Sequence, residues 1–257
     1  MNRELIVTAF YTIVRKEIRR FLRIWTQTLV PPMVTMSLYF VIFGNLIGPR
    51  IGEMDGHRYM DYIAPGLIMM SVITNSYSNV TSSFFSARFQ RFVEEMLVSP
   101  TPNLVIILGY VVGGVVRGIC VGASVTCIAM LFANMQVNSI LVTIVVVILT
   151  ATVFALAGFI NAIFARSFDD ISIVPTFILT PLTYLGGVFY SISLLSDFWQ
   201  GVSKLNPILY MVNAFRYGIL GVSDIPLWAA FVIIAIFIGA LLTLALWLMD
   251  HGVGIRA

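Results

Sequence analysis

The chain has 257 residues, of which 59% are hydrophobic and only 11% are charged. Soluble domains carry about 25% charged residues, so this composition excludes an ordinary soluble protein and predicts several membrane spans. The formal net charge of +3 does not call for a nucleic acid partner, because cations gathered on one side of a membrane account for it.

The first 26 residues predict an amphipathic helix lying in the membrane interface. Apolar side chains recur at helical spacing on one face, at Phe10, Val14, Ile18, Phe21 and Trp25. Cations gather on another face, at Lys16, Arg19, Arg20 and Arg23. We expect these cations to face anionic headgroups. The alternative is a simple charge signal that fixes membrane orientation.

Six apolar stretches reach the roughly 20 residues that a membrane-crossing helix needs. They cover residues 27–47, 63–85, 105–132, 140–164, 171–190 and 226–249. The predicted fold is therefore an all-α membrane protein with six transmembrane helices, forming a single transmembrane domain over residues 1–257.

Two of these spans carry polar residues at membrane depth. The second is rich in Ser, Thr and Asn, including Asn75 and Asn79, and the third contains Arg117. Such groups either line a wet translocation path or hydrogen-bond between helices. For Arg117 we consider a path or substrate role, against structural pairing or snorkelling to the interface.

Residues 87–103 predict a short amphipathic helix in an aqueous loop. Phe89, Phe92, Val93 and Met96 share a face by spacing, whereas Arg91, Glu94 and Glu95 supply charge. This pattern is suited to docking on a partner. The alternative is a solvated linker that rests on the headgroups.

Residues 191–224 are long enough to cross a membrane but are broken by charge and by the Asn206-Pro207 step. Proline removes a backbone donor and disfavours helix in the preceding residue. We expect a re-entrant helical hairpin that returns to the side from which it came.

Six spans place both termini on one side, and the positive charge identifies that side as cytoplasmic. The terminal side holds ten cations, Arg3, Arg15, Lys16, Arg19, Arg20, Arg23, Arg88, Arg91, Arg166 and Arg256. The opposite side holds four, Arg50, Arg58, Lys204 and Arg216. The hairpin then lies on the outer side, and the loop helix lies on the cytoplasmic side.

No energy source is apparent in the chain itself. All carboxylates fall in predicted loops, tails or the hairpin, which argues against an ion-coupled carrier. The Gly-x-x-x-x-Gly-Lys-Ser/Thr phosphate loop is absent, as are hydrolase and zinc-protease motifs, so we predict no enzyme, no cofactor and no metal site. A transport protein of this kind needs an external motor, and the loop helix at 87–103 is where we expect it to dock.

The sequence after the fifth span resembles the signature of the type-2 ABC transporter permeases. Its residues are Gly186, Gly187 and Phe189, followed by Asn206, Pro207, Tyr210 and Arg216. The resemblance extends over nearly the whole chain. It implies an exporter subunit of a bacterial inner membrane, working as a homodimer with two copies of a separate ATPase.

The resemblance also implies roles for individual residues. It makes 87–103 the coupling helix, with Phe89, Arg91, Glu94 and Glu95 as contacts to the ATPase. For the outer gate we choose Phe189, Trp199, Asn206, Pro207, Tyr210 and Arg216, and for a possible translocation path Asn75, Asn79 and Arg117. The alternatives are a channel or facilitator not coupled to ATP, and a membrane scaffold without transport. Nothing in the sequence selects the substrate, although an amphipathic molecule suits the aromatic and small polar residues.

Overall fold

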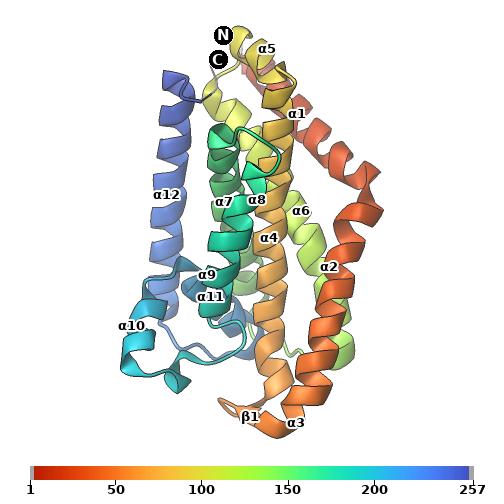
Figure 1. Cartoon of the computed structure of the whole chain (residues 1–257), viewed down its shortest axis with the longest axis vertical. Helices are drawn as coiled ribbons and strands as arrows, with labels where there is room; N and C mark the ends of the chain where they lie inside the picture. Colours follow the sequence, from red (N-terminus) through yellow and green to blue (C-terminus); the bar gives the residue numbers. More distant parts are fainter. Residues whose placement is uncertain (1–2, 255–257) are drawn as a thin grey trace.

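The computed structural model describes residues 3–254, and its helices run up and down in one bundle (Figure 1). Within residues 3–254, four helical stretches are long and apolar enough to cross a membrane. They are Trp25–Ile51, made of α2 (Trp25–Tyr39), a π-helix (Phe40–Ile47) and α3 (Gly48–Ile51), then α6 (Asn103–Phe132), α7 (Ile140–Phe164) and α12 (Leu227–His251). They contain four of the predicted spans, extended or shifted at their ends by a few residues.

The second predicted span lies within α4 (Tyr59–Phe89), a helix of 31 residues at the centre of the bundle. It is long enough to span a membrane, but its Ser, Thr and Asn residues leave it less apolar than those four. It packs against α6, α7 and α11 (Pro207–Leu220). Apart from Arg88 and Phe89 at its C-terminal end, only one stripe of it stays accessible, at Asp61, Met70, Thr74, Ser78, Ser82 and Ser86.

Glycines on α6 allow two neighbouring helices to approach closely. A Cβ atom at Gly113 would lie 2.5 Å from the Glu17 Cβ of α1 (Arg3–Arg23). On the side that faces α4, a Cβ at Gly114 would lie 2.6 Å from a Val80 methyl, and one at Gly118 would lie 2.0 Å from the Ser76 hydroxyl. The glycines of α6 therefore serve two packing faces, one for α1 and one for α4.

Replacing Gly118 with valine is expected to destabilise the bundle by about 1–3 kcal/mol, because α4 must move to admit the side chain. The matched control is Gly239→Val on α12, where an added Cβ meets no atom within 4 Å. Thermal unfolding of both variants in detergent measures the difference. Equal midpoints for Gly118→Val and Gly239→Val would contradict the packing described here.

The N-terminal helix α1 only partly follows the predicted amphipathic pattern. Phe21 is fully buried, but Trp25 is 55% exposed because the chain turns at Ile24 before α2 begins. Arg20 was expected among the headgroup-facing cations, but it points inward and donates to Asn79 of α4. The predicted grouping of those four cations is therefore wrong for Arg20.

The fifth predicted span, 171–190, is too long. The helix covers 16 residues, as α8 (Asp170–Val174), a π-helix (Pro175–Leu179) and α9 (Thr180–Leu185). At 1.5 Å per residue it extends about 24 Å, short of the roughly 30 Å of a bilayer core. It ends at Gly186-Gly187, where Gly187 has a φ of +71° that disfavours any residue with a side chain.

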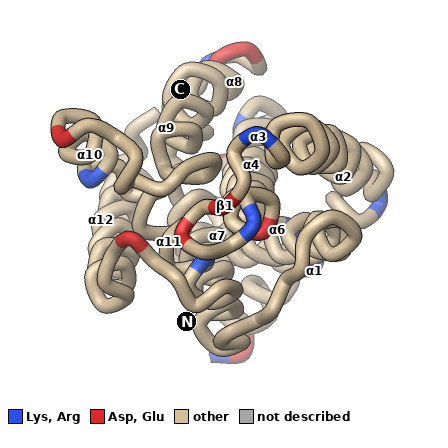
Figure 2. Tube along the Cα trace, turned by 90° about the horizontal axis from the view of Figure 1, so that it is seen from below, with Lys and Arg blue, Asp and Glu red and all other residues tan. Residues whose placement is uncertain are grey.

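The remaining elements lie at the two ends of the bundle. At the lower end are the hairpin β1 (Glu53–Met54) and β2 (His57–Arg58), a 3-10 turn (Ile192–Leu194), α10 (Asp197–Lys204) and the start of α11. Seen from below, charged residues mark α10, the loop before α12 and the β-hairpin (Figure 2). The upper end carries α5 (Phe92–Val98), the start of α1 and the end of α12.

Candidate functional site

The signature residues that are far apart in sequence form one unit at the lower end of the bundle. Arg216 Nη2 donates to the Gly187 carbonyl over 2.6 Å, and Asn206 Nδ2 donates to the Leu182 carbonyl over 2.5 Å. A Cβ at Gly186 would lie 2.7 Å from an Ile208 methyl group. The Gly-Gly turn and the start of α11 therefore hold each other in place.

The Asn206-Pro207 step begins a helix as well as interrupting the chain. Asn206 is the N-cap of α11, and its Oδ1 accepts from the Ile208 N–H over 3.0 Å. Pro207 occupies the first helical position, where a missing N–H costs little. The predicted break at this step is confirmed, because α10 ends at Lys204 and α11 begins at Pro207. The re-entry of this hairpin into a bilayer stays a prediction.

Arg216 is fully buried at the junction of α11, α4 and the Gly-Gly turn. Its Nε donates to the Tyr62 carbonyl over 3.3 Å, and its guanidinium lies 4.0 Å from the centre of the Tyr62 ring. Its Nη1 donates to Asn213 Oδ1 over 3.4 Å. Within residues 3–254 no carboxylate forms an ion pair with it, so carbonyl groups and an aromatic face stabilise this cation.

An aromatic cluster joins this unit to the first span. The ring of Phe189 lies 4.9 Å from that of Phe43, 6.1 Å from that of Tyr39 and 5.6 Å from that of Tyr184. Its carbonyl accepts from the Tyr59 hydroxyl over 3.2 Å. The sequence had pointed to Phe189 alone, because Tyr39 and Phe43 belong to the first span, far away along the chain.

The other chosen gate residues lie outside this cluster. Trp199 is on α10, is 48% exposed and contacts Phe198. The Tyr210 hydroxyl donates to the Lys204 carbonyl over 2.9 Å and so closes the turn between α10 and α11. The structure therefore divides the predicted gate into a buried part around Phe189, Asn206 and Arg216, and an exposed part on α10.

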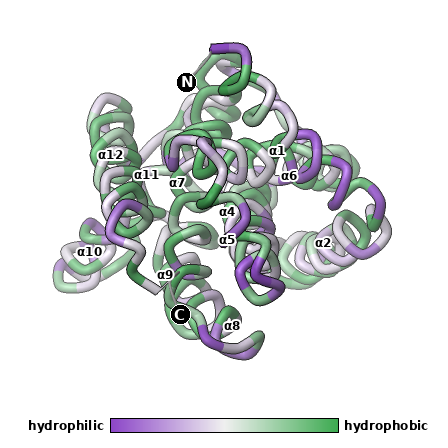
Figure 3. Tube along the Cα trace, turned by 90° about the horizontal axis from the view of Figure 1, so that it is seen from above, coloured by the Kyte–Doolittle hydropathy of each residue, from purple (hydrophilic) through white to green (hydrophobic). Residues whose placement is uncertain are grey.

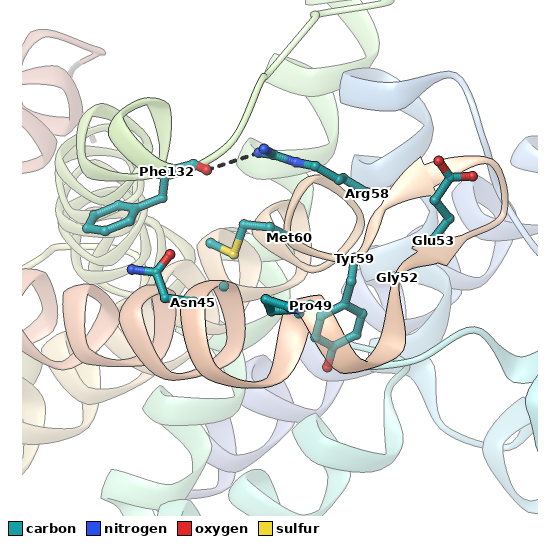
Figure 4. A pocket seen from close by; sticks show the side chains of 10 residues that line it. Asn45, Pro49, Gly52, Glu53, Arg58, Tyr59, Met60 and Phe132 are labelled. Atoms are coloured by element: carbon teal, nitrogen blue, oxygen red, sulfur yellow. Dashed lines mark hydrogen bonds between the residues drawn. The ribbon is translucent and has the colours of Figure 1, made fainter.

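A pocket of about 330 Å³ opens at the same end, beside the β-hairpin (Figure 4). Arg58 reaches across it and donates to the Phe132 carbonyl over 3.3 Å. Its walls are formed by Gly44, Asn45, Gly48, Pro49, Gly52, Glu53, Arg58, Tyr59, Met60 and Phe132. The widened π-helix of the first span therefore forms one wall of a cavity large enough for a small molecule.

At the upper end, α5 is shorter than the predicted helix at 87–103. Phe89 ends α4, and Arg91 adopts a left-handed conformation, with a φ of +62°, that separates the two helices. Phe89 and Phe92 are 64% and 48% exposed, whereas Val93 is buried. The expected common face is therefore wrong for Phe89, because the chain turns between Phe89 and the helix that carries Phe92, Val93 and Met96.

The charged residues of this segment are accessible. Arg91, Glu94 and Glu95 are all exposed. Seen from above, hydrophilic residues surround α5 and the start of α8, between more hydrophobic helices (Figure 3). We define the upper surface as Phe89, Arg91, Phe92, Glu94, Glu95 and Phe168.

Phe168 joins this surface through the loop between α7 and α8. Its ring lies 5.4 Å from that of Phe89 and 4.9 Å from that of Phe85. The loop is fixed by Asp170, which accepts from the N–H groups of Arg166 and Ser167 over 2.8 and 3.1 Å. The Arg166 N–H, and then the Ser167 side chain, lower the pKa of the Asp170 carboxyl below its ordinary value.

Arg88 anchors the surface from below. It donates to the carbonyl groups of Ala162, Ile163 and Ala165 at the end of α7, and its guanidinium lies over the Phe85 ring. Cations are favoured at helix C-termini, where the last carbonyls lack partners. The hydrogen bonds of Arg88 therefore connect α4 to the end of α7 directly beneath the upper surface.

The polar residues chosen at membrane depth all face neighbouring helices. Asn79 is fully buried and accepts from Arg20, and Asn75 accepts from Arg117 over 3.2 Å. Glu17 of α1 is fully buried as well. The sequence analysis missed Glu17, although its spacing of four residues from Ile13 and Phe21 places it on their inward face.

Comparison with known proteins identifies the protein family to which the chain belongs. The sequence profile of the ABC-2 type transporter family matches residues 8–220, and the chain belongs to that family. The inner membrane transport permease YadH of Escherichia coli (strain K12) is 59% identical over 249 residues, which are 97% of each chain. Nodulation protein J of Neorhizobium galegae is 23% identical over 216 residues, 83% of this chain and 82% of that protein.

These matches confirm the predicted family resemblance and establish a multi-pass inner membrane transport permease subunit. The matched range runs from α1 to the end of α11. It therefore includes both the upper surface and the Gly-Gly, Asn-Pro and Arg216 unit.

Proposed function

We propose that the chain is the transmembrane subunit of an ATP-driven exporter, powered by a separate ATPase. Membership of the ABC-2 type transporter family carries this proposal. The absence of a phosphate-loop motif from the sequence supports it, because the nucleotide site then belongs to another chain. By the same resemblance two copies of the chain work with two ATPases. The aromatic and small polar side chains suit an amphipathic substrate.

In this proposal α4 and the α8–α9 stretch cross the membrane with the four apolar helices, giving six crossings. The bilayer thins locally around the short α8–α9 stretch. Both termini are cytoplasmic, as the excess of Lys and Arg on that side favours. The upper surface then faces the cytoplasm. The hairpin over residues 191–224 lies at the outer face and acts as the gate.

The coupling route follows from the contacts at the upper end. The ATPase binds the upper surface, and its movement reaches α4 through Phe89 and α7 through Arg88. The accessible stripe of α4 lines the path between two copies of the chain, with Asn75, Asn79 and Arg117 beside it. At the outer end the Gly-Gly unit and the aromatic cluster around Phe189 close the path.

The test removes both acids of α5, in Glu94→Ala with Glu95→Ala. Both side chains are exposed, so folding should be unaffected, while ATPase copurification and ATP-dependent flux into vesicles should fall. The matched control for ATPase copurification is Glu53→Ala with Asp197→Ala, which removes two exposed acids at the opposite end and should leave ATPase recovery unchanged.

Unchanged ATPase binding and flux in the α5 variant would refute this assignment. Accumulation of substrate against a gradient by the chain alone in liposomes would refute the dependence on ATP. Downhill flux at the same rate with and without ATP would support the alternative of a channel or facilitator.

A further inference from the structure

Two arginines and one glutamate meet the same face of α4. Arg20 Nη2 donates to Asn79 Oδ1 over 2.8 Å and to the Asn79 carbonyl over 3.0 Å, and it pairs with Glu17 over 3.4 Å. Arg117 Nη2 donates to Asn75 Oδ1 over 3.2 Å. Among residues 3–254 the three charged groups therefore leave one positive charge without an acid.

The cluster lies deep in the helical bundle. Arg117 follows the first residue of α6 by 14 positions, about 21 Å along a helix of roughly 45 Å. Asn75 and Asn79 are one helical turn apart, which brings the two guanidinium groups close to each other. An uncompensated cation at membrane depth is costly and is a functional indication.

The cluster also has more donors than acceptors. Arg20 Nε, Arg117 Nε and Asn79 Nδ2 are buried and have no hydrogen-bond partner among the described residues. Asn79 is itself fully buried. Because buried polar groups are normally paired, three unpaired donors on side chains that hydrogen bonds tie to Asn75 and Asn79 of α4 indicate that an acceptor binds there.

Access to the cluster remains open. The Arg20 side chain is 31% exposed, and Arg117 is half-buried. Thr74 and Ser78, on the accessible stripe of α4, lie about 100° around the helix from Asn75 and Asn79, so the accessible stripe adjoins the face that carries the cluster. A ligand that moves along this stripe would meet both guanidinium groups.

We infer that Arg20, Arg117 and Asn79 form a binding site for the oxyanion group of an amphipathic molecule, a phosphate or a carboxylate. Arginine offers planar pairs of donors that match both groups. Glu17 holds Arg20 in place and lowers the net positive charge, so it tunes how strongly the anion binds. This inference rests on the proposed function and gives its substrate class.

The site can be tested on the chain alone, without its ATPase. Native mass spectrometry of the protein in a neutral detergent measures binding of lysophosphatidic acid and of the uncharged monoacylglycerol with the same acyl chain, which lacks the phosphate. We expect the anionic lipid to bind at least about tenfold more tightly, a difference typical of one charge-assisted contact. Arg117→Gln and Arg20→Gln should each remove most of that preference.

Two further variants separate recognition of charge from a defect in folding. Arg19→Gln removes the same charge from the exposed face of α1, one residue from Arg20, and should change nothing. Glu17→Gln keeps the side-chain shape and removes the negative charge, so it should bind the anionic lipid severalfold more tightly. A damaged bundle would not gain affinity.

Equal binding of the two lipids by the wild type would overturn the inference, as would a preference that survives in both arginine variants. Inorganic phosphate, added as a competitor, identifies the source of the anion. Displacement of the lysolipid shows that a free oxyanion suffices, and its failure shows that the acyl chain is needed too. Lipid binding is measured without the ATPase. The binding site and the proposed ATP-driven function can therefore be refuted independently of each other.

Discussion

Replacing Arg216 with methionine is expected to destabilise the protein by about 2–4 kcal/mol, because buried carbonyl groups lose a charged donor. The Gly187 and Tyr62 carbonyls would lose their hydrogen bonds, and the turn after α9 would lose its tie to α11. Thermal unfolding in detergent should show a midpoint lower by about 5–10 °C.

The design of this experiment includes two comparisons. Arg216→Lys keeps the charge but cannot reach two carbonyl groups with a planar fork, so an intermediate midpoint is expected. Arg50→Met removes an exposed arginine at the same end of the bundle and should leave the midpoint unchanged. If Arg216→Met were as stable as Arg50→Met, Arg216 would not be the tie between the Gly-Gly turn and α11.

Replacing Phe89 and Phe92 with serine is expected to weaken ATPase binding at least about tenfold, since exposed aromatic side chains often supply 1–2 kcal/mol each at an interface. Both rings are exposed on the upper surface, so most of the loss should appear in binding. Copurification of the ATPase at graded salt and detergent concentrations measures it.

The control for this pair lies at the opposite end of the helical bundle. Phe198→Ser with Leu205→Ser removes two exposed apolar side chains, 71% and 85% exposed, from α10 and the turn after it. ATPase recovery should be unchanged in that variant. Equal losses in the two variants would mean that general instability, rather than the upper surface, explains the result.

Local sequence patterns were sufficient for much of the fold. Apolar stretches over 105–132, 140–164 and 226–249 match α6, α7 and α12 closely, because a helix in lipid must satisfy its own backbone and be apolar along its length. The Asn206-Pro207 step marks the start of α11 for an equally local reason, since capping and proline chemistry act within one turn.

Local patterns were least accurate where neighbouring helices decide the outcome. Spacing could not show that Arg91 adopts a left-handed conformation and separates Phe89 from Phe92. It assigned Arg20 to the headgroups, because the partner Asn79 lies 59 positions away. Glu17 shares its helical face with Ile13 and Phe21, but its burial depends on Gly113 leaving space on α6.

The sequence by itself determined the class of this protein: a membrane bundle of the ABC-2 type with a short exposed helix and a broken hairpin. Composition and helical periodicity are properties of single segments, so they are evident from the sequence alone. Only the tertiary structure decided that the Gly-Gly turn, Asn206 and Arg216 form one unit, and that Glu17, Arg20 and Arg117 meet α4. Pairing between segments depends on the fit of side chains and on hydrogen bonds and ion pairs to buried charged groups. The sequence of a single helix shows neither.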